Sequence, residues 1–146
     1  VLLSVIVYKG KAFVPTSYEV DKGLYRTDEP IRVVKLDLEA LQSALEDAFQ
    51  LGNPPYNRQL HERARSHKDV VLQATHATSW LALARHGYSY GIAWRTIEAV
   101  LAVSRVDEKG RFVDDPSKTQ HFAPDTSMKV IAEAILADMS ARPEVQ

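Results

Sequence analysis

Residues 37–52 read DLEALQSALEDAFQLG, and this stretch decides the fold class of the 146-residue chain. Asp37 is a residue type that caps helix N-termini, and Gly52 followed by Asn-Pro-Pro is typical of a helix end. Steps of three, four and four residues place on one helical face Leu38, Leu41, Leu45 and Phe49. The sequence therefore predicts an amphipathic helix from Asp37 to Leu51.

A second helix is predicted near the end of the sequence, from Thr126 to Met139. Pro124 precedes it, Asp125 or Thr126 is its expected cap, and Pro143 ends it. Its apolar stripe consists of Met128, Ile131, Ile135, Leu136 and Met139.

Short β-favouring runs occupy most of the remaining sequence. Asp21–Gly23 and Asp107–Gly110 carry turn signals, and His86-Gly87 could join two strands tightly. Trp80–Arg85 is also compatible with a helix. The predicted strands are Leu2–Tyr8, Ala12–Val14 before Pro15, Ile31–Leu36 after Pro30, Val70–Gln73, Trp80–Arg85, Tyr88–Trp94, Ala99–Arg105 and Phe112-Val113. Consecutive short strands favour a mostly antiparallel sheet with two main helices packed on it, an α+β fold, and residues 1–146 are expected to form a single domain.

Composition narrows the class of function. Eighteen basic residues face nineteen acidic ones, so the net charge is −1, and the basic excess typical of nucleic-acid-binding proteins is missing. The sequence has no cysteine, which excludes disulfides, thiolate nucleophiles and cysteine-ligated metal sites. The apolar run Val1–Tyr8 is too short to span a bilayer. We therefore expect a cytoplasmic protein that binds neither nucleic acid nor membranes.

Each candidate catalytic motif lacks a residue, a spacing or a structural context that its chemistry requires. His61-Glu62 would need a second histidine at position 65 for a zinc protease motif, but that position is Arg65, and His67 is out of step. The stretch Gly87–Gly91 spells Gly-x-Ser-x-Gly around Ser89, yet it favours a strand with no helix directly after it. His76, His86 and His121 have no partner at ligand spacing, and the glycines form no phosphate-binding loop. We expect no enzyme activity, no metal and no cofactor.

Acidic charge is concentrated in the first predicted helix. Between Leu36 and Asn57 every charged residue is acidic, and a basic cluster follows from Arg58 to Lys68. An ordinary solvated face is one interpretation, and a surface for a basic partner is the other. The predicted partner-binding residues are Glu39, Glu46 and Asp47, with Asp114 and Asp115 as a secondary patch. Candidate aromatic anchors, for which the core is the competing interpretation, are Tyr25, Tyr56, Tyr88, Tyr90 and Trp94.

The last part of the chain carries a family resemblance. It reads Tyr-Ser-Tyr-Gly-Ile-Ala-Trp over 88–94, Val-Ser-Arg over 103–105, Asp-Glu-Lys-Gly-Arg-Phe over 107–112 and Lys-Thr-Gln-His-Phe-Ala-Pro-Asp-Thr over 118–126, followed by the amphipathic helix. In this pattern, about a third of the sequence resembles small bacterial immunity proteins of contact-dependent growth inhibition systems.

The resemblance implies a cytoplasmic protein that binds and neutralises the C-terminal toxin domain of a cognate effector. Many such toxins are nucleases with basic clefts. The immunity proteins are not enzymes and need no cofactor, and their binding surfaces differ between cognate pairs, so no binding residue carries over. Two alternatives stay open: a small hydrolase or nuclease whose site joins one of the histidines to Asp114 or Asp115, and a regulatory interaction domain.

Overall fold

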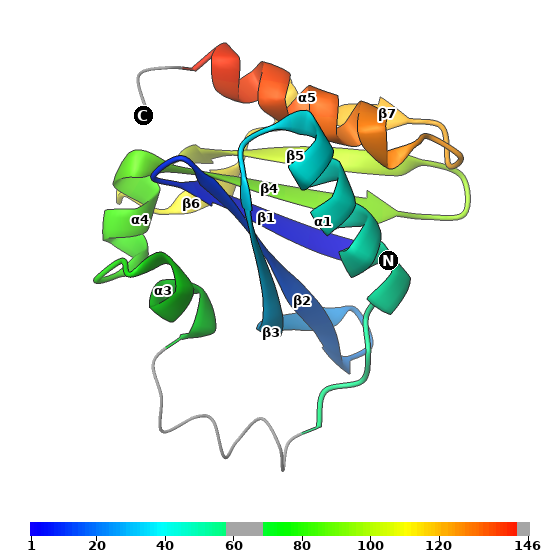
Figure 1. Ribbon diagram of the computed structural model, residues 1–146, viewed down its shortest axis with the longest axis horizontal. Helices are drawn as coiled ribbons and strands as arrows, with labels where there is room; N and C mark the ends of the chain where they lie inside the picture. The colour runs from blue at the N-terminus through cyan, green and yellow to red at the C-terminus, as the bar shows by residue number, and fades with distance from the viewer. Residues whose placement is uncertain (58–68, 143–146) are drawn as a thin grey trace.

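The computed structural model describes residues 1–57 and 69–142. It shows an antiparallel sheet with helices on both faces (Figure 1). The strand order among these residues is β3-β2-β1-β4-β5-β6, with β7 paired to β5, and every ladder is antiparallel. The strands are β1 (Leu2–Tyr8), β2 (Lys11–Asp21), β3 (Leu24–Lys35), β4 (Gly87–Trp94), β5 (Ala99–Val106), β6 (Phe112–Asp114) and β7 (Gln120–Phe122). The predicted α+β class is confirmed.

Both predicted helices are present. In α1 (Leu38–Leu51) the Asp37 side chain accepts a hydrogen bond from the Ala40 backbone N–H at 2.8 Å, so Asp37 is the cap as predicted. The second helix, α5 (Met128–Ser140), is instead capped by Ser127, which accepts from the Val130 N–H; the prediction of Asp125 or Thr126 as the cap is wrong. No helix in the described ranges is long and apolar enough to cross a membrane.

Two predicted strands are helices. Val70–Gln73 lies in α3 (Val70–Thr75), because the Asp69 carboxylate accepts hydrogen bonds from the N–H groups of the first turn. Trp80–Arg85 lies in α4 (Trp80–His86), capped by Ser79, so the helical alternative is correct there. His86-Gly87 therefore connects α4 to β4, and the prediction that it joins two strands is wrong. Short apolar runs fit either structure, and here capping side chains and packing decide.

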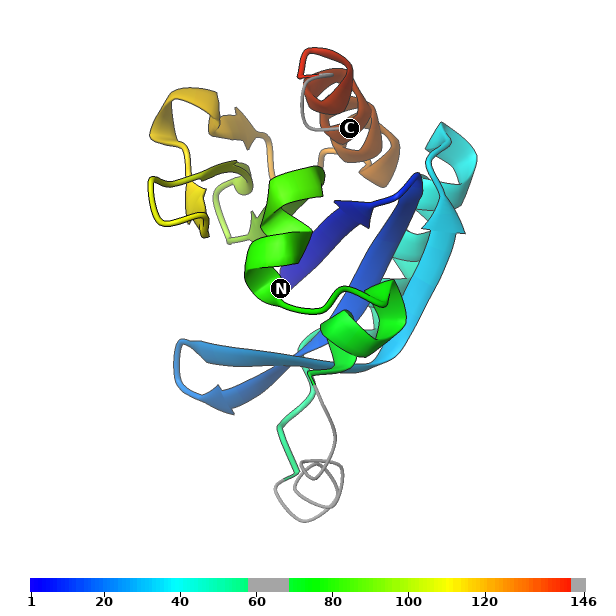
Figure 2. The ribbon, with the colours of Figure 1, turned by 90° about the vertical axis from the view of Figure 1, so that its left-hand side faces the viewer.

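The central strand β1 is buried on both faces. Leu3, Val5 and Val7 point into a core beneath α1 and α5, whereas Ile6 and Tyr8 join a second cluster with residues of α3 and α4. Because strand side chains alternate between faces, the two helix pairs must cover opposite sides of the sheet. Figure 2 looks onto α3 and α4, with α1 behind the sheet.

The β2–β3 hairpin is longer than the sequence suggests. Both strands continue past a proline, Pro15 in β2 and Pro30 in β3. The register jumps from the pair Val14–Arg32 to the pair Thr16–Asp28, so both prolines lie at a bulge. A proline lacks an N–H to donate to a ladder, and a bulge is where this loss is tolerated.

Asn53 holds β1 and β2 together where they diverge. The two strands pair from Ile6–Phe13 to Tyr8–Lys11, and β2 then runs on beyond that ladder. The Asn53 side chain accepts from the Leu2 N–H and donates to the Leu2 and Ser17 carbonyl oxygens, each at 2.8 Å. Further along β2, the backbone of Glu19 bonds to the Pro54 carbonyl oxygen and the Tyr56 N–H, both at 2.9 Å. The segment after α1 thus closes the free edge of β2.

Gly87 is required where α4 meets β4. A Cβ atom there would lie 2.7 Å from the carbonyl oxygens of both Leu83 and Val7, which are backbone atoms with little freedom to move. We expect Gly87→Ala to lower the free energy of unfolding by about 3 kcal/mol, the upper range for overpacking. Denaturant unfolding measures this. Gly91→Ala is the control in the same strand, since its Cβ would meet Ala102 at an ordinary 3.9 Å. A similar loss in both variants would contradict the steric explanation.

Candidate protein-binding surface

The helix α1 presents its acidic residues to solvent. Its buried stripe is Leu41, Ala44, Leu45 and Ala48, so Glu39, Glu46 and Asp47 are exposed on the outer side. The predicted stripe is only partly correct, because Phe49 is 38% exposed. Whether the three carboxylates bind a partner stays a prediction.

Asp47 is engaged within the chain. Its carboxylate lies 2.7 Å from Nε of Arg32 on β3, and Arg32 also donates to Thr16. The Arg32 side chain is 13% exposed and that of Asp47 is 67% exposed. The guanidinium therefore offsets the charge of Asp47, and the pair ties α1 to β3.

Glu46 faces a groove at the other side of the helix. This groove has a volume of about 400 Å³ and lies between the last turns of α1 and the segment that leads into α5. Glu46 accepts a hydrogen bond from Gln42 at 2.8 Å. The lining residues are Glu46, Phe49, Gln50, Trp94, Pro124, Asp125, Thr126 and Met128. The rings of Phe49 and Trp94 meet edge to face, with centroids 4.9 Å apart.

Asp114 and Asp115 lie away from this groove, at the end of β6. The helix α1 packs against β1, β2 and β3, whereas β6 ends the strand order on the opposite side. Asp115 accepts from the hydroxyl and N–H of Ser117, and the hydroxyl bond is the larger cause of its lowered pKa. The primary and secondary patches therefore lie over different halves of the sheet.

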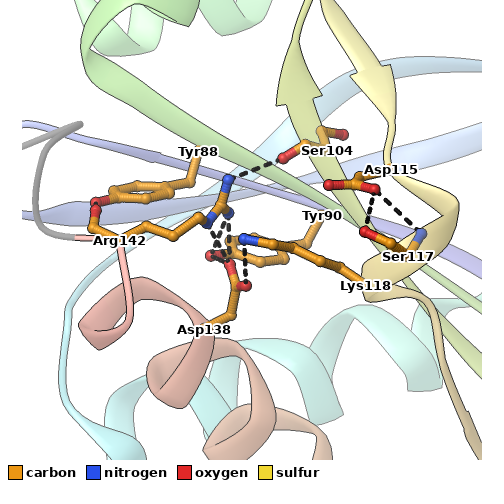
Figure 3. A network of polar contacts seen from close by, with 8 residues as sticks. All are labelled: Tyr88, Tyr90, Ser104, Asp115, Ser117, Lys118, Asp138 and Arg142. Carbon is orange, nitrogen blue, oxygen red and sulfur yellow. Dashed lines mark hydrogen bonds and ion pairs between the residues drawn. The ribbon is translucent and has the colours of Figure 1, made fainter.

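A polar network fastens the end of α5 to the sheet (Figure 3). The Tyr90 hydroxyl donates to Asp138 at 2.8 Å, Arg142 donates to the same carboxylate and to the Ser104 carbonyl oxygen, and Lys118 lies 3.8 Å from Asp138. Tyr88 donates to the Arg142 carbonyl oxygen.

These partners shift the ionisation of the network. Burial, and next the bond to Asp138, raises the pKa of the Tyr90 hydroxyl far above its usual value. Burial lowers the pKa of Arg142, but hydrogen bonds to Asp138 and Tyr90 outweigh it and raise the pKa overall. The sequence showed only the i,i+4 spacing of Asp138 and Arg142; the tyrosines join them through the fold. Because these polar groups bind one another, the network acts as a structural clamp.

The aromatic candidates divide between core and surface. Tyr88 and Tyr90 are 2% and 1% exposed, so they belong to the core. Tyr56 lies under the guanidinium of Arg26, and Tyr25 is exposed on β3. Trp94 is half-buried at the groove. It is the candidate that the structure places beside the acidic face.

The candidate catalytic residues lie on different elements: His76 follows α3, His86 ends α4, His121 is in β7 and Asp114 ends β6. Ser89 pairs with Ile6 inside β4, so Gly87–Gly91 is a strand and not a nucleophile turn. His121 contacts Glu98 at 3.1 Å. The whole basic cluster from Arg58 to Lys68 lies outside the described residues, and so do His61, Glu62 and His67 within it. Within residues 1–57 and 69–142 no three ligating side chains are grouped to hold a metal ion.

Solved structures share this fold. One is the protein of unknown function NMB0488 from Neisseria meningitidis, with 13% identity, a TM-score of 0.69 and coverage of 96% of this chain and 93% of that chain. Another is a chain of the CdiA-CT/CdiI toxin and immunity complex from Yersinia pseudotuberculosis, with 15% identity, a TM-score of 0.63 and 95% of each chain covered. No family model and no curated protein matches the sequence. At these identities the likeness shows a common fold.

The raised pKa of Tyr90 predicts an alkaline loss of stability. Below pH about 10, the usual tyrosine value, the hydroxyl is protonated in both the folded and the unfolded chain. Above it the unfolded chain releases the proton first, which favours unfolding. We expect the free energy of unfolding to fall more steeply above pH 10 in the native protein than in Tyr90→Phe, by up to about 1.4 kcal/mol per pH unit.

Urea unfolding at a series of alkaline pH values measures the two slopes. Tyr25→Phe removes a hydroxyl from an exposed ring and keeps Tyr90, so it should retain the native slope. Parallel curves for the native protein and Tyr90→Phe would contradict the prediction.

Proposed function

We propose that this protein is an immunity protein that binds and neutralises the toxin domain of a bacterial contact-dependent growth inhibition system. The supporting observation is a fold matched, over 95% of both chains, by a chain of the CdiA-CT/CdiI toxin and immunity complex. The sequence pattern of residues 88–139 resembles the same class of proteins independently of that comparison. The two observations draw on different properties, one on backbone geometry and one on residue order.

A nuclease toxin fits the charge of the surface best. Nucleases hold a polyanionic backbone in basic clefts, and a protein with exposed carboxylates complements such a cleft. Glu39 and Glu46 on α1 supply this charge, and Asp114 and Asp115 form a secondary contact. Asp47 contributes less, because Arg32 holds it. The protein acts by occupying the toxin in the cytoplasm, without turnover or a cofactor.

Coproduction with the toxin domain encoded beside its own gene tests the proposal. The two proteins should copurify as a complex, and the immunity chain should restore growth to cells that produce the toxin domain. Nuclease activity of the purified toxin should fall in proportion to added protein. A toxin that stays fully active with excess protein, with no complex formed, would refute the immunity function.

The charge of α1 should govern the rate of association. Electrostatic steering raises association rates by about 10-fold to 1000-fold and weakens as salt increases. We expect Glu39→Lys with Glu46→Lys to slow association with the toxin domain by about tenfold or more at low salt, with little change in dissociation. Stopped-flow fluorescence at low and high salt measures both rates.

A charge reversal outside α1 shows whether the association rate depends on the position of the carboxylate or only on the net charge of the protein. Glu108→Lys, in the exposed turn between β5 and β6, changes the net charge as much as Glu46→Lys does. It should slow association less than Glu46→Lys. Equal rates for native protein and the double variant at low salt would remove α1 from the interface.

A further inference from the structure

The groove beside Glu46 is lined by apolar side chains and by two carboxylates. Phe49 and Trp94 form an aromatic wall, and Pro124 and Met128 add further apolar surface. The charged residues among its lining are Glu46 and Asp125, both acidic and both exposed. Glu46 comes from α1 and Asp125 from the segment before α5. Apolar walls between two carboxylates suit an occupant with an apolar stem and a cationic end.

We propose that this groove binds an arginine side chain of the protein partner. The aliphatic stem packs on Met128 and Pro124, and the guanidinium lies against the aromatic pair within reach of Glu46 and Asp125. The inference rests on the proposed function only for the identity of the partner. It places a specific anchor within the acidic surface, where charge alone gives only steering.

Arginine fits this groove better than lysine. Its planar guanidinium stacks on aromatic rings and forms paired hydrogen bonds with carboxylates, and it loses water more readily than an ammonium group. Buried arginine side chains are among the residues that contribute most to protein interfaces. Trp94 supplies the ring type that binds cations best. The carboxylates discriminate against an acidic or neutral side chain.

Fluorescence of Trp94 provides a direct test. The sequence has two tryptophans, so Trp80→Phe leaves Trp94 as the single reporter. The probe is a blocked hexaarginine peptide, titrated into the Trp80→Phe protein, with hexalysine for comparison. We expect a saturable change in Trp94 emission, tighter binding of hexaarginine than of hexalysine, and weaker binding as salt increases.

Variants separate the groove from general surface charge. Glu46→Gln with Asp125→Asn should weaken hexaarginine binding about tenfold, whereas Glu108→Gln with Glu133→Gln, the same loss of charge outside the lining, should weaken it less than twofold. Phe49→Ala removes one ring of the pair and should weaken binding about fivefold with all carboxylates in place. Equal effects of the two carboxylate pairs, or no effect of Phe49→Ala, would overturn the proposal.

The peptide titration contains no toxin, so its result is independent of the proposed function. Loss of binding in the groove variants supports the arginine site even if no toxin complex forms. Conversely, the toxin can be neutralised while the peptide titration fails, and that outcome overturns the groove proposal alone.

Discussion

Burial of β1 on both faces is the constraint on which this structure depends. A strand whose side chains are apolar on both sides must be covered by two layers, and α1 with α5 covers one side while α3 and α4 cover the other. The sheet is antiparallel, yet its centre resembles the doubly covered strands of parallel sheets in its run of Val, Ile and Leu. Because α1 covers one of these faces, its opposite side, with the acidic residues, is exposed to solvent.

The acidic surface results from the way in which α1 covers one face of β1. Leu41 and Leu45 face the core, so Glu39, Glu46 and Asp47 face outward. Consecutive helix residues point about 100° apart, so Asp47 reaches Arg32 on β3 while Glu46 lines the groove beside α5. Neighbouring carboxylates therefore have different roles. One fixes the helix to the sheet through Arg32, and the other borders a groove. A charge map drawn along the sequence treats them as equivalent.

The sequence predicted those features that are encoded locally. The Asp37 cap, the leucine stripe of α1 and the turn at Asp107–Gly110 each depend on residues a few positions apart. The strand prediction for Val70–Gln73 is wrong because a short apolar run fits a strand as well as a helix, and here the Asp69 cap and the packing of Val71 favour the helix. The groove unites Glu46, Trp94 and Asp125, which only tertiary structure brings together. No periodicity or spacing connects them.

The side chain of Asn53 bridges β1 and β2 at the place where these two strands diverge. Its amide replaces backbone hydrogen bonds between β1 and β2 where the two strands have separated, so the Leu2 N–H and the carbonyl oxygens of Leu2 and Ser17 stay paired although β2 diverges from β1. Further along β2, Pro54 and Tyr56 bond to the backbone of Glu19 and cover the edge that β1 leaves open. The unpaired N–H and carbonyl groups of an exposed strand edge can pair with strands of other molecules. Asn53, which bridges β1 and β2 where they diverge, therefore also begins the segment that covers this edge against pairing with other molecules.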